Sequence, residues 1–400
     1  MEQDMTQGKP LSIILKFTLP LLVGNIFQQF YNMADTIIVG RFVGANALAA
    51  VGSTGTVMFL IIGFAQGITA GFTILTSQRY GAKDEKAVRA SVANGILLSV
   101  LVAILITVVG LSTMKPLLLL MNTPEDIFAD AYTYSMLICS GVVACIFYNL
   151  FSSLLRAIGN SVVPLLFLAV SAVLNVILDL VCVLVWHWGV RGAAAATTFS
   201  QFVSGIGIGL YTLKKFPQLC PKKEDCRWDK QNLATILNLS VMTSVQQSIM
   251  NFGILMVQGL VNSFGTVIMA AFAAAVKIDS FAYMPVQDFG NAFSTYVAQN
   301  YGAGQTDRIR KGIRSAGGCS AAFCIVISVL VCAFAAPLMG IFIDPAETAI
   351  LAAGVHYLHI EGACYLGIGI LFLLYGYYRA VNQPQMSVVL TIASLGTRVA

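Results

Sequence analysis

Long apolar runs follow one another along the whole chain, and they limit what it can fold into. A helix crosses a bilayer with about 20 apolar residues, and inside the bilayer every backbone polar group must be paired. By length and apolarity the sequence predicts eleven spans, at about 13–38, 48–77, 91–114, 127–151, 164–187, 192–213, 232–262, 267–298, 315–338, 346–378 and from 386 to the end. The chain is 58% hydrophobic and only 10% charged, far from the roughly 25% charged residues of a soluble domain. We therefore expect an all-α membrane protein with many spans.

The positive residues predict how these spans are oriented. With the N-terminus in the cytoplasm, 18 of the 23 lysines and arginines lie in cytoplasmic loops or flanks, as the positive-inside rule requires. Topology also accounts for the net charge of +5, so this charge does not indicate a nucleic-acid partner. The first apolar run is long and contains Lys16, which is typical of a retained span in a cell membrane rather than a cleaved signal peptide.

The chain repeats itself after 221 residues. The pentapeptide at 78–82, QRYGA, returns as QNYGA at 299–303. This repeat predicts an N-terminal lobe over 1–213, a cytoplasmic linker over 214–231 and a C-terminal lobe over 232–400. Six spans are an even number, so the two six-helix bundles should have the same orientation, related by an axis along the membrane normal. Only the start of a counterpart to 164–213 follows Ser387, so we expect an incomplete second bundle and a C-terminally truncated chain.

A carboxylate lies in the middle of the fifth predicted span. Asp179 follows Asn175 by four residues, so both side chains share one helix face. The next span offers Thr197 and Gln201. A charge at bilayer depth costs at least about 2.5–3.5 kcal/mol, which favours a functional role. The alternative is a structural hydrogen bond between helices.

A second carboxylate ends a polar stripe on the first span. Gln28, Tyr31 and Asp35 lie on one helix face. Between 13 and 213 no lysine or arginine lies deep in a span, so either a carboxyl group is protonated or a cation is bound. Both options describe an ion-coupling site for H⁺ or Na⁺, because each ion can neutralise the pair and leave. Oxygen-bearing side chains would also suit a hard cation.

The second half carries its own polar residues. Lys277 and Asp288 project from nearly the same face of the eighth span, but at 1.5 Å per residue they are about 16 Å apart along it. Lys277 either pairs with an acid on another helix or lines a central cavity. Gln246 and Met284 are further candidates for this cavity, although methionine in a membrane helix is more often a packing residue. No metal site is expected beyond possible Na⁺ binding.

Several motifs together resemble one family, the multidrug and toxin extrusion (MATE) family. They are FTLPLLVGNIFQQFYNMADTIIVGRFVGANALAAVG in the first two spans, QRYGA and QNYGAG after the second and eighth, and LNVILD in the fifth. The resemblance covers essentially the whole chain. It implies a two-lobed, twelve-helix efflux antiporter that alternates between outward-open and inward-open states and exchanges organic compounds for protons or sodium.

The resemblance also implies which residues couple transport to an ion. The site of the most similar branch matches Asp35, Asn175, Asp179 and Thr197, and residues that line the same lobe map to Gln28 and Tyr134. Other branches carry acidic groups on the seventh and tenth helices, whereas this chain has Gln246 and Gln247 on the seventh and an acid, Glu361, only on the tenth. We therefore do not assign a coupling site to the C-terminal lobe.

Two other function classes compete with this interpretation. A lipid-linked precursor flippase of the same superfamily would need a basic cavity, whereas only Lys277 and Arg398 are basic within spans. A membrane prenyltransferase would need a DDxxD motif, which is absent, as is a Walker motif for ATP. We expect a monomeric transporter of small-molecule drugs or toxins and not an enzyme, with the bilayer as its surroundings and no cofactor besides H⁺ or Na⁺.

Overall fold

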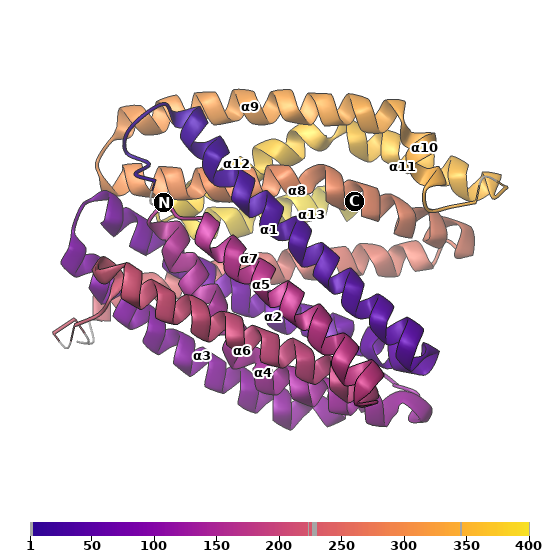
Figure 1. Ribbon diagram of the computed structural model, residues 1–400. Helices are drawn as coiled ribbons and strands as arrows, with labels where there is room; N and C mark the ends of the chain where they lie inside the picture. Colours follow the sequence, from indigo (N-terminus) through magenta and orange to yellow (C-terminus); the bar gives the residue numbers. More distant parts are fainter. Residues whose placement is uncertain (1–2, 223, 226–229, 345, 400) are drawn as a thin grey trace. The chain divides into compact units, whose positions relative to one another are not determined.

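The structure is a computed structural model that describes residues 3–222, 224–225, 230–344 and 346–399 (Figure 1). Every regular element in these ranges is a helix. The helices are α1 (Pro10–Ile38), α2 (Ala45–Gly81), α3 (Glu85–Leu120), α4 (Glu125–Ala157), α5 (Val162–Leu180), α6 (Gly189–Lys215), α7 (Lys230–Asn262), α8 (Thr266–Gly302), α9 (Thr306–Ala333), α10 (Ala335–Gly340), α11 (Thr348–Ala363), α12 (Tyr365–Ala380) and α13 (Pro384–Val399). The π-helical turns η1 (Val39–Val43) and η2 (Val181–Val185) continue α1 and α5, and the 3₁₀ turn η3 (Pro217–Leu219) follows α6.

Each expected span coincides with a helix or with two consecutive helices. Within the described ranges, seven helices are long and apolar enough to cross a membrane, and α11 with α12 forms an eighth candidate. The predicted all-α, multi-span fold class is confirmed. One difference is local: the span expected over 346–378 is bent by 49° where α11 meets α12. The hydropathy of this segment is continuous through the bend, so apolarity alone did not predict it.

The described chain forms two compact units. Unit 1 comprises Gln3 and 23–244, and unit 2 comprises 4–22 and 245–399. Helices α1 and α7 therefore each belong in part to both units. The division into lobes at 213 and 232 stays a prediction, and within its linker residues 223 and 226–229 lie outside the described residues.

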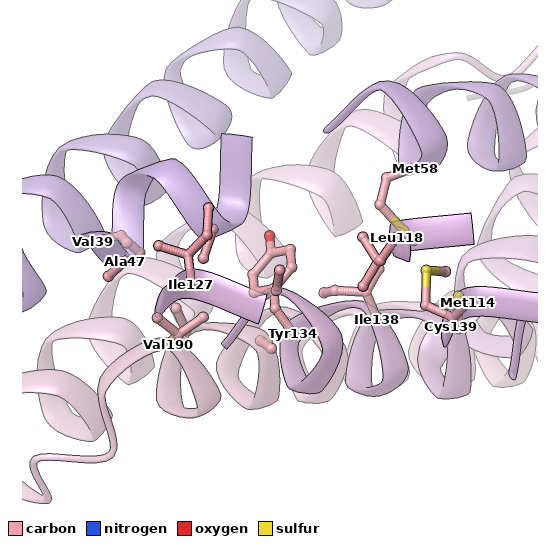
Figure 2. Close-up of a cluster of buried hydrophobic side chains, with 14 residues drawn as sticks. Val39, Ala47, Met58, Met114, Leu118, Ile127, Tyr134, Ile138, Cys139 and Val190 are labelled. Carbon is pink, nitrogen blue, oxygen red and sulfur yellow. The ribbon is translucent and has the colours of Figure 1, made fainter. Parts of the chain in front are cut away.

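Helix α4 is the central helix of unit 1 and packs against α2, α3 and α6. Figure 2 shows the apolar cluster around it, in which Tyr134 and Ile138 of α4 lie among side chains of the neighbouring helices. Glycines permit the closest approaches to α6. A Cβ on Gly205 would lie 2.8 Å from the carbonyl oxygen of Ala144, and one on Gly141 would lie 2.7 Å from Cγ2 of Thr198. Small residues thus let α4 and α6 pack with their backbones close together.

Unit 2 has its apolar core among α8, α9, α11 and α12. Here too glycine permits close contact between helices. A Cβ on Gly290 of α8 would lie 2.9 Å from the carbonyl oxygen of Phe372, and one on Gly376 of α12 would lie 2.6 Å from the carbonyl oxygen of Gly290. The two helices therefore approach each other along a glycine-lined face.

An ion pair holds the described part of the linker to unit 1. The Asp225 carboxylate accepts a hydrogen bond from the Lys222 amide at 3.0 Å and one from Nε of Arg89 at 2.9 Å. These donors, with the backbone amide contributing most, hold the pKa of Asp225 below its usual range. The linker segment before α7 is therefore tied to the start of α3.

Candidate functional site

The buried face of α5 is polar although the helix is strongly apolar. Its buried positions include Ala172, Asn175 and Asp179, which recur every three to four residues as expected for one helix face. Both polar side chains are completely buried. Large apolar residues cover the opposite face, such as Val173 and Ile177, each more than half exposed. The sequence pattern thus turns one polar face of α5 toward the interior of unit 1.

Hydrogen bonds join α5 to α6 at three levels. Ser204 of α6 donates to the carbonyl oxygen of Phe167 at 3.2 Å, and Ser171 of α5 donates to that of Ser200 at 3.1 Å. Asn175 and Thr197 form the third level. This ladder fixes the register of the two helices and so places Thr197 beside the polar face of α5.

Asn175 connects the carboxyl group to α6. With its amide nitrogen toward Asp179, Nδ2 donates to Asp179 Oδ2 at 2.9 Å. The amide oxygen then accepts from Oγ1 and from the backbone N–H of Thr197, each at 3.2 Å. An amide can donate on one side and accept on the other, so a single side chain satisfies a carboxylate and a hydroxyl at once.

Asp35 of α1 completes the cluster. The carboxyl groups of Asp35 and Asp179 lie within interaction distance of each other. Because an ionised carboxylate only accepts hydrogen bonds, a direct hydrogen bond between the two groups would need a proton on one of them. One oxygen of each group, Oδ1 in both cases, is buried and makes no hydrogen bond to the described residues. The geometry therefore leaves two carboxyl oxygens available to a proton or a cation.

Two tyrosines border this cluster. Tyr31, one helical turn before Asp35, forms a side-chain hydrogen bond with Thr197. Tyr134 of α4 is 9% exposed and lies within electrostatic range of Tyr31 and both carboxyl groups. Within the part of the chain that the structure describes, no lysine or arginine forms an ion pair with Asp35 or Asp179. The site is thus an acidic pair, with Asp179 completely buried and Asp35 half-buried, among neutral hydrogen-bonding groups.

The structure brings together Asp35, Asn175, Asp179 and Thr197, with Tyr31 and Tyr134 beside them. It does not bring the other predicted residues into this hydrogen-bond network. Gln28 is exposed and Gln201 is half-buried one turn beyond Thr197. The remaining predicted cavity residues belong to unit 2 and are Gln246 (buried), Lys277 (exposed), Met284 (half-buried) and Asp288 (buried). Their role in a substrate cavity stays a prediction.

One buried polar contact is not predicted by the sequence. In unit 2 the hydroxyl of Tyr365, the first residue of α12, donates to Oδ1 of buried Asp279 on α8 at 2.5 Å. The sequence shows Asp279 as a carboxylate inside a span, which signals a buried partner. It does not show which of the many tyrosines is that partner, because the bend between α11 and α12 decides where Tyr365 points.

Comparison with known proteins shows the family. The sequence profile of the MatE family matches residues 20–181 and 240–400. The chain is 29% identical over 393 residues to YpnP of Bacillus subtilis, a probable multidrug resistance protein. The alignment covers 98% of this chain and 87% of that protein. It is 23% identical to an FAD transporter of Shewanella oneidensis, covering 96% of this chain and 85% of that protein.

Solved structures show the same fold. A multidrug resistance MATE family transporter in the outward-facing conformation superposes with a TM-score of 0.89 at 22% identity, covering 97% of this chain and 86% of the other. A structure of MATE in complex with MaL6 gives a TM-score of 0.90, also at 22% identity, covering 97% and 87%. Because the family profile matches most of its length, this chain belongs to the MatE family, the multi-span multidrug and toxin extrusion transporters, which are not enzymes.

Proposed function

We propose that this transporter works as an antiporter in the cell membrane, with its N-terminus in the cytoplasm, and exports organic, often cationic, compounds in exchange for H⁺ or Na⁺. Family membership supports transport, and its relatives in Bacillus subtilis, which are named as probable multidrug resistance proteins, support drugs as substrates. The observation that carries the coupling step is the contact between the carboxyl groups of Asp35 and Asp179 inside unit 1.

The acidic pair binds an ion because it cannot stay doubly charged. Two carboxylates in contact repel each other, and burial disfavours both charges. A proton shared between them, or a sodium ion bound by their free oxygens with Asn175 and Thr197 nearby, removes this cost. The loaded pair is therefore stable, and the empty pair attracts the next ion from the side to which it opens.

Ion binding acts on the substrate through α1. Asp35 lies on this helix, and Pro20 interrupts its hydrogen-bond ladder because proline has no N–H to donate. The border between the two units falls between residues 22 and 23, just beyond Pro20. Loading of the pair shifts or bends α1 near this point and favours release of the exported compound. Binding of the next compound from the cytoplasm then requires the ion to leave.

Transport of a fluorescent cation in membrane vesicles tests the proposal. Asp35→Asn and Asp179→Asn should each abolish gradient-driven transport at normal expression, because the amide mimics the neutral, loaded carboxyl group. Asp288→Asn is the control and should have a smaller effect, since Asp288 lies on α8 in unit 2. Dissipating the pH and sodium gradients one at a time identifies the ion. Retained gradient-driven transport in both aspartate variants would refute the assignment.

The alternative function is a flippase for lipid-linked precursors, and the residues favour it less. A diphosphate-bearing substrate would need several cations to bind it, whereas between residues 13 and 213 no lysine or arginine lies deep in a span. We also propose that the protein works as a monomer, because the acidic pair and its hydrogen-bonding partners all come from unit 1 of one chain.

A further inference from the structure

The start of the chain is bound tightly to unit 2. Met5 is completely buried and Thr6 is 7% exposed, although both precede the first helix. The Met5 amide donates to Oε1 of Gln299 at 3.0 Å, and the Met5 carbonyl accepts from Nδ2 of Asn300 at 3.0 Å. Gln299 and Asn300 are the first two residues of the repeated QNYGA motif. Their side-chain amides therefore pair with both backbone polar groups of Met5.

Arg308 of α9 holds the same segment from the other side. Its guanidinium donates to the carbonyl oxygen of Met5 at 3.2 Å, to that of Gly8 at 3.0 Å and to Oδ1 of Asn300 at 3.0 Å. The group lies 6.0 Å from the centre of the Tyr296 ring, whose hydroxyl donates to the Arg308 carbonyl oxygen at 2.8 Å. A planar guanidinium offers five donors in a fixed fork. Here it binds two backbone carbonyl groups that lie three residues apart, those of Met5 and Gly8.

The bound segment also has a defined shape of its own. The backbone N–H and the hydroxyl of Thr6 both donate to Oδ1 of Asp4, at 2.8 and 2.5 Å. Gly8 has a φ of +83°, a conformation that glycine adopts at no steric cost. The chain then enters α1 at Pro10. Residues 4–8 thus form a short folded segment, and after one further residue the chain begins α1.

Unit 1 repeats this arrangement with the arginine on the opposite helix. At the 221-residue shift, Arg79 corresponds to Asn300 and Ala87 corresponds to Arg308. Arg79 donates to the carbonyl oxygen of Ala87 at 2.9 Å and also contacts Asn232 in the first turn of α7. In both units a guanidinium therefore lies at the junction between two consecutive helices, α2–α3 or α8–α9, and contacts the segment at the start of a third long helix, α7 or α1.

We infer that Gln299, Asn300 and Arg308 form an anchor that fixes the start of α1 to unit 2, so that movement of α1 at Asp35 is transmitted to unit 2. The inference rests on the proposed ion site at Asp35. Residues 4–22 belong to unit 2, whereas the part of α1 that carries Asp35 belongs to unit 1. A helix held at its start transmits displacement along its axis. A helix with a free start absorbs the same displacement by sliding.

Two variants and a matched control test the anchor. Arg308→Ala and deletion of residues 3–8 should each slow gradient-driven transport by at least about tenfold, the change in a population that loss of even one charge-assisted hydrogen bond produces. The purified wild-type protein should show an ion-dependent change in tryptophan fluorescence, to which Trp186 and Trp188 beyond α5 contribute, and both variants should retain this change. Arg310→Ala removes an exposed arginine two residues away and should transport like the wild type. Wild-type transport by Arg308→Ala would overturn the inference.

Hydrogen exchange tests the anchor independently of transport. The Met5 amide should exchange slowly in the wild-type protein, and about tenfold faster in Arg308→Ala as the anchored fraction falls. Exchange in the wild type at the rate of an unstructured peptide would overturn the anchor, whether or not the variants fold. Retained coupled transport in Asp35→Asn would instead overturn the ion site, and with it the transmission through α1, while leaving the slow exchange of Met5 intact.

Discussion

At the scale of single residues, one amide decides how the acidic pair works. Asn175 donates to Asp179 and accepts from Thr197, and Thr197 also forms a side-chain hydrogen bond with Tyr31. The amide thus links the Asp179 carboxyl group to two hydroxyl-bearing side chains. A cation that enters this network meets oriented oxygen atoms, whereas a proton needs only the two carboxyl groups. On the proposed mechanism we therefore expect the neutral members to adjust ion affinity and the carboxyl groups to determine whether an ion binds at all.

Replacement of Thr197 by alanine should weaken coupling without abolishing it. The change removes one neutral hydrogen-bonding group and no charge, which costs about 0.5–1.5 kcal/mol, or roughly a two- to tenfold loss of apparent ion affinity. The ion concentration that gives half-maximal transport in vesicles measures this loss. Thr198→Ala is the matched control, because Thr198 donates to the carbonyl oxygen of Leu137 at 3.3 Å and so turns toward α4. Equal losses in both variants would show that Thr197 has no specific role.

At the scale of secondary-structure elements, glycine positions hold the polar helices in place. Helix α6 carries Thr197 and contacts α4 on one side and α5 on the other. The approach of α6 to α4 depends on Gly205, whose missing side chain leaves room for a backbone carbonyl of α4. Hydrophobic burial contributes little between helices in lipid, so close packing and hydrogen bonds determine their distance.

A methyl group at position 205 should therefore destabilise unit 1. In Gly205→Ala the new Cβ would lie 2.8 Å from the Ala144 carbonyl oxygen, and relieving such a contact costs about 1–3 kcal/mol. The melting temperature of the purified protein should fall. Gly52→Ala on α2 is the control, because a Cβ there has no neighbour within 4 Å and alanine is the better helix former. An unchanged melting temperature for Gly205→Ala would contradict the close α4–α6 contact.

At the scale of the whole molecule, the internal repeat and the positive charges predict one topology. The loop after α2 contains Lys83, and the corresponding loop after α8 is followed by Arg308, Arg310 and Lys311. The loop after α3, at 121–124, has no basic residue. Both repeated QxYGA motifs are thus predicted on the cytoplasmic side, where positive residues are retained during membrane insertion.

Reporter fusions test this topology directly. A reporter active only outside the cytoplasm should be inactive when fused after residue 83 or after residue 304, and active when fused after residue 122. If the two halves have the same orientation, the fusions after residues 83 and 304 must have the same reporter activity. Opposite activities at 83 and 304 would exclude the parallel repeat and point to an inverted one.

The sequence by itself determined the helices and the chemistry of the site. Apolar runs of span length leave the backbone no alternative in a bilayer, and the carboxylates within them are few enough to make Asp35 and Asp179 candidates. The spacing of Asn175 and Asp179 also placed both on one face, because helix geometry is local. These predictions needed only the helical repeat, which sets how many residues separate two side chains on the same face of a helix.

Only the tertiary structure decided which faces meet. Asp35 and Asp179 are 144 residues apart, and their contact depends on the packing of α1 against α5, which no helical period encodes. The same is true of Met5 and Gln299, which are 294 residues apart. Likewise the bend that directs Tyr365 toward Asp279 interrupts a continuous apolar run. A polar residue in a span signals that a partner exists, but the partner is chosen by how whole helices pack.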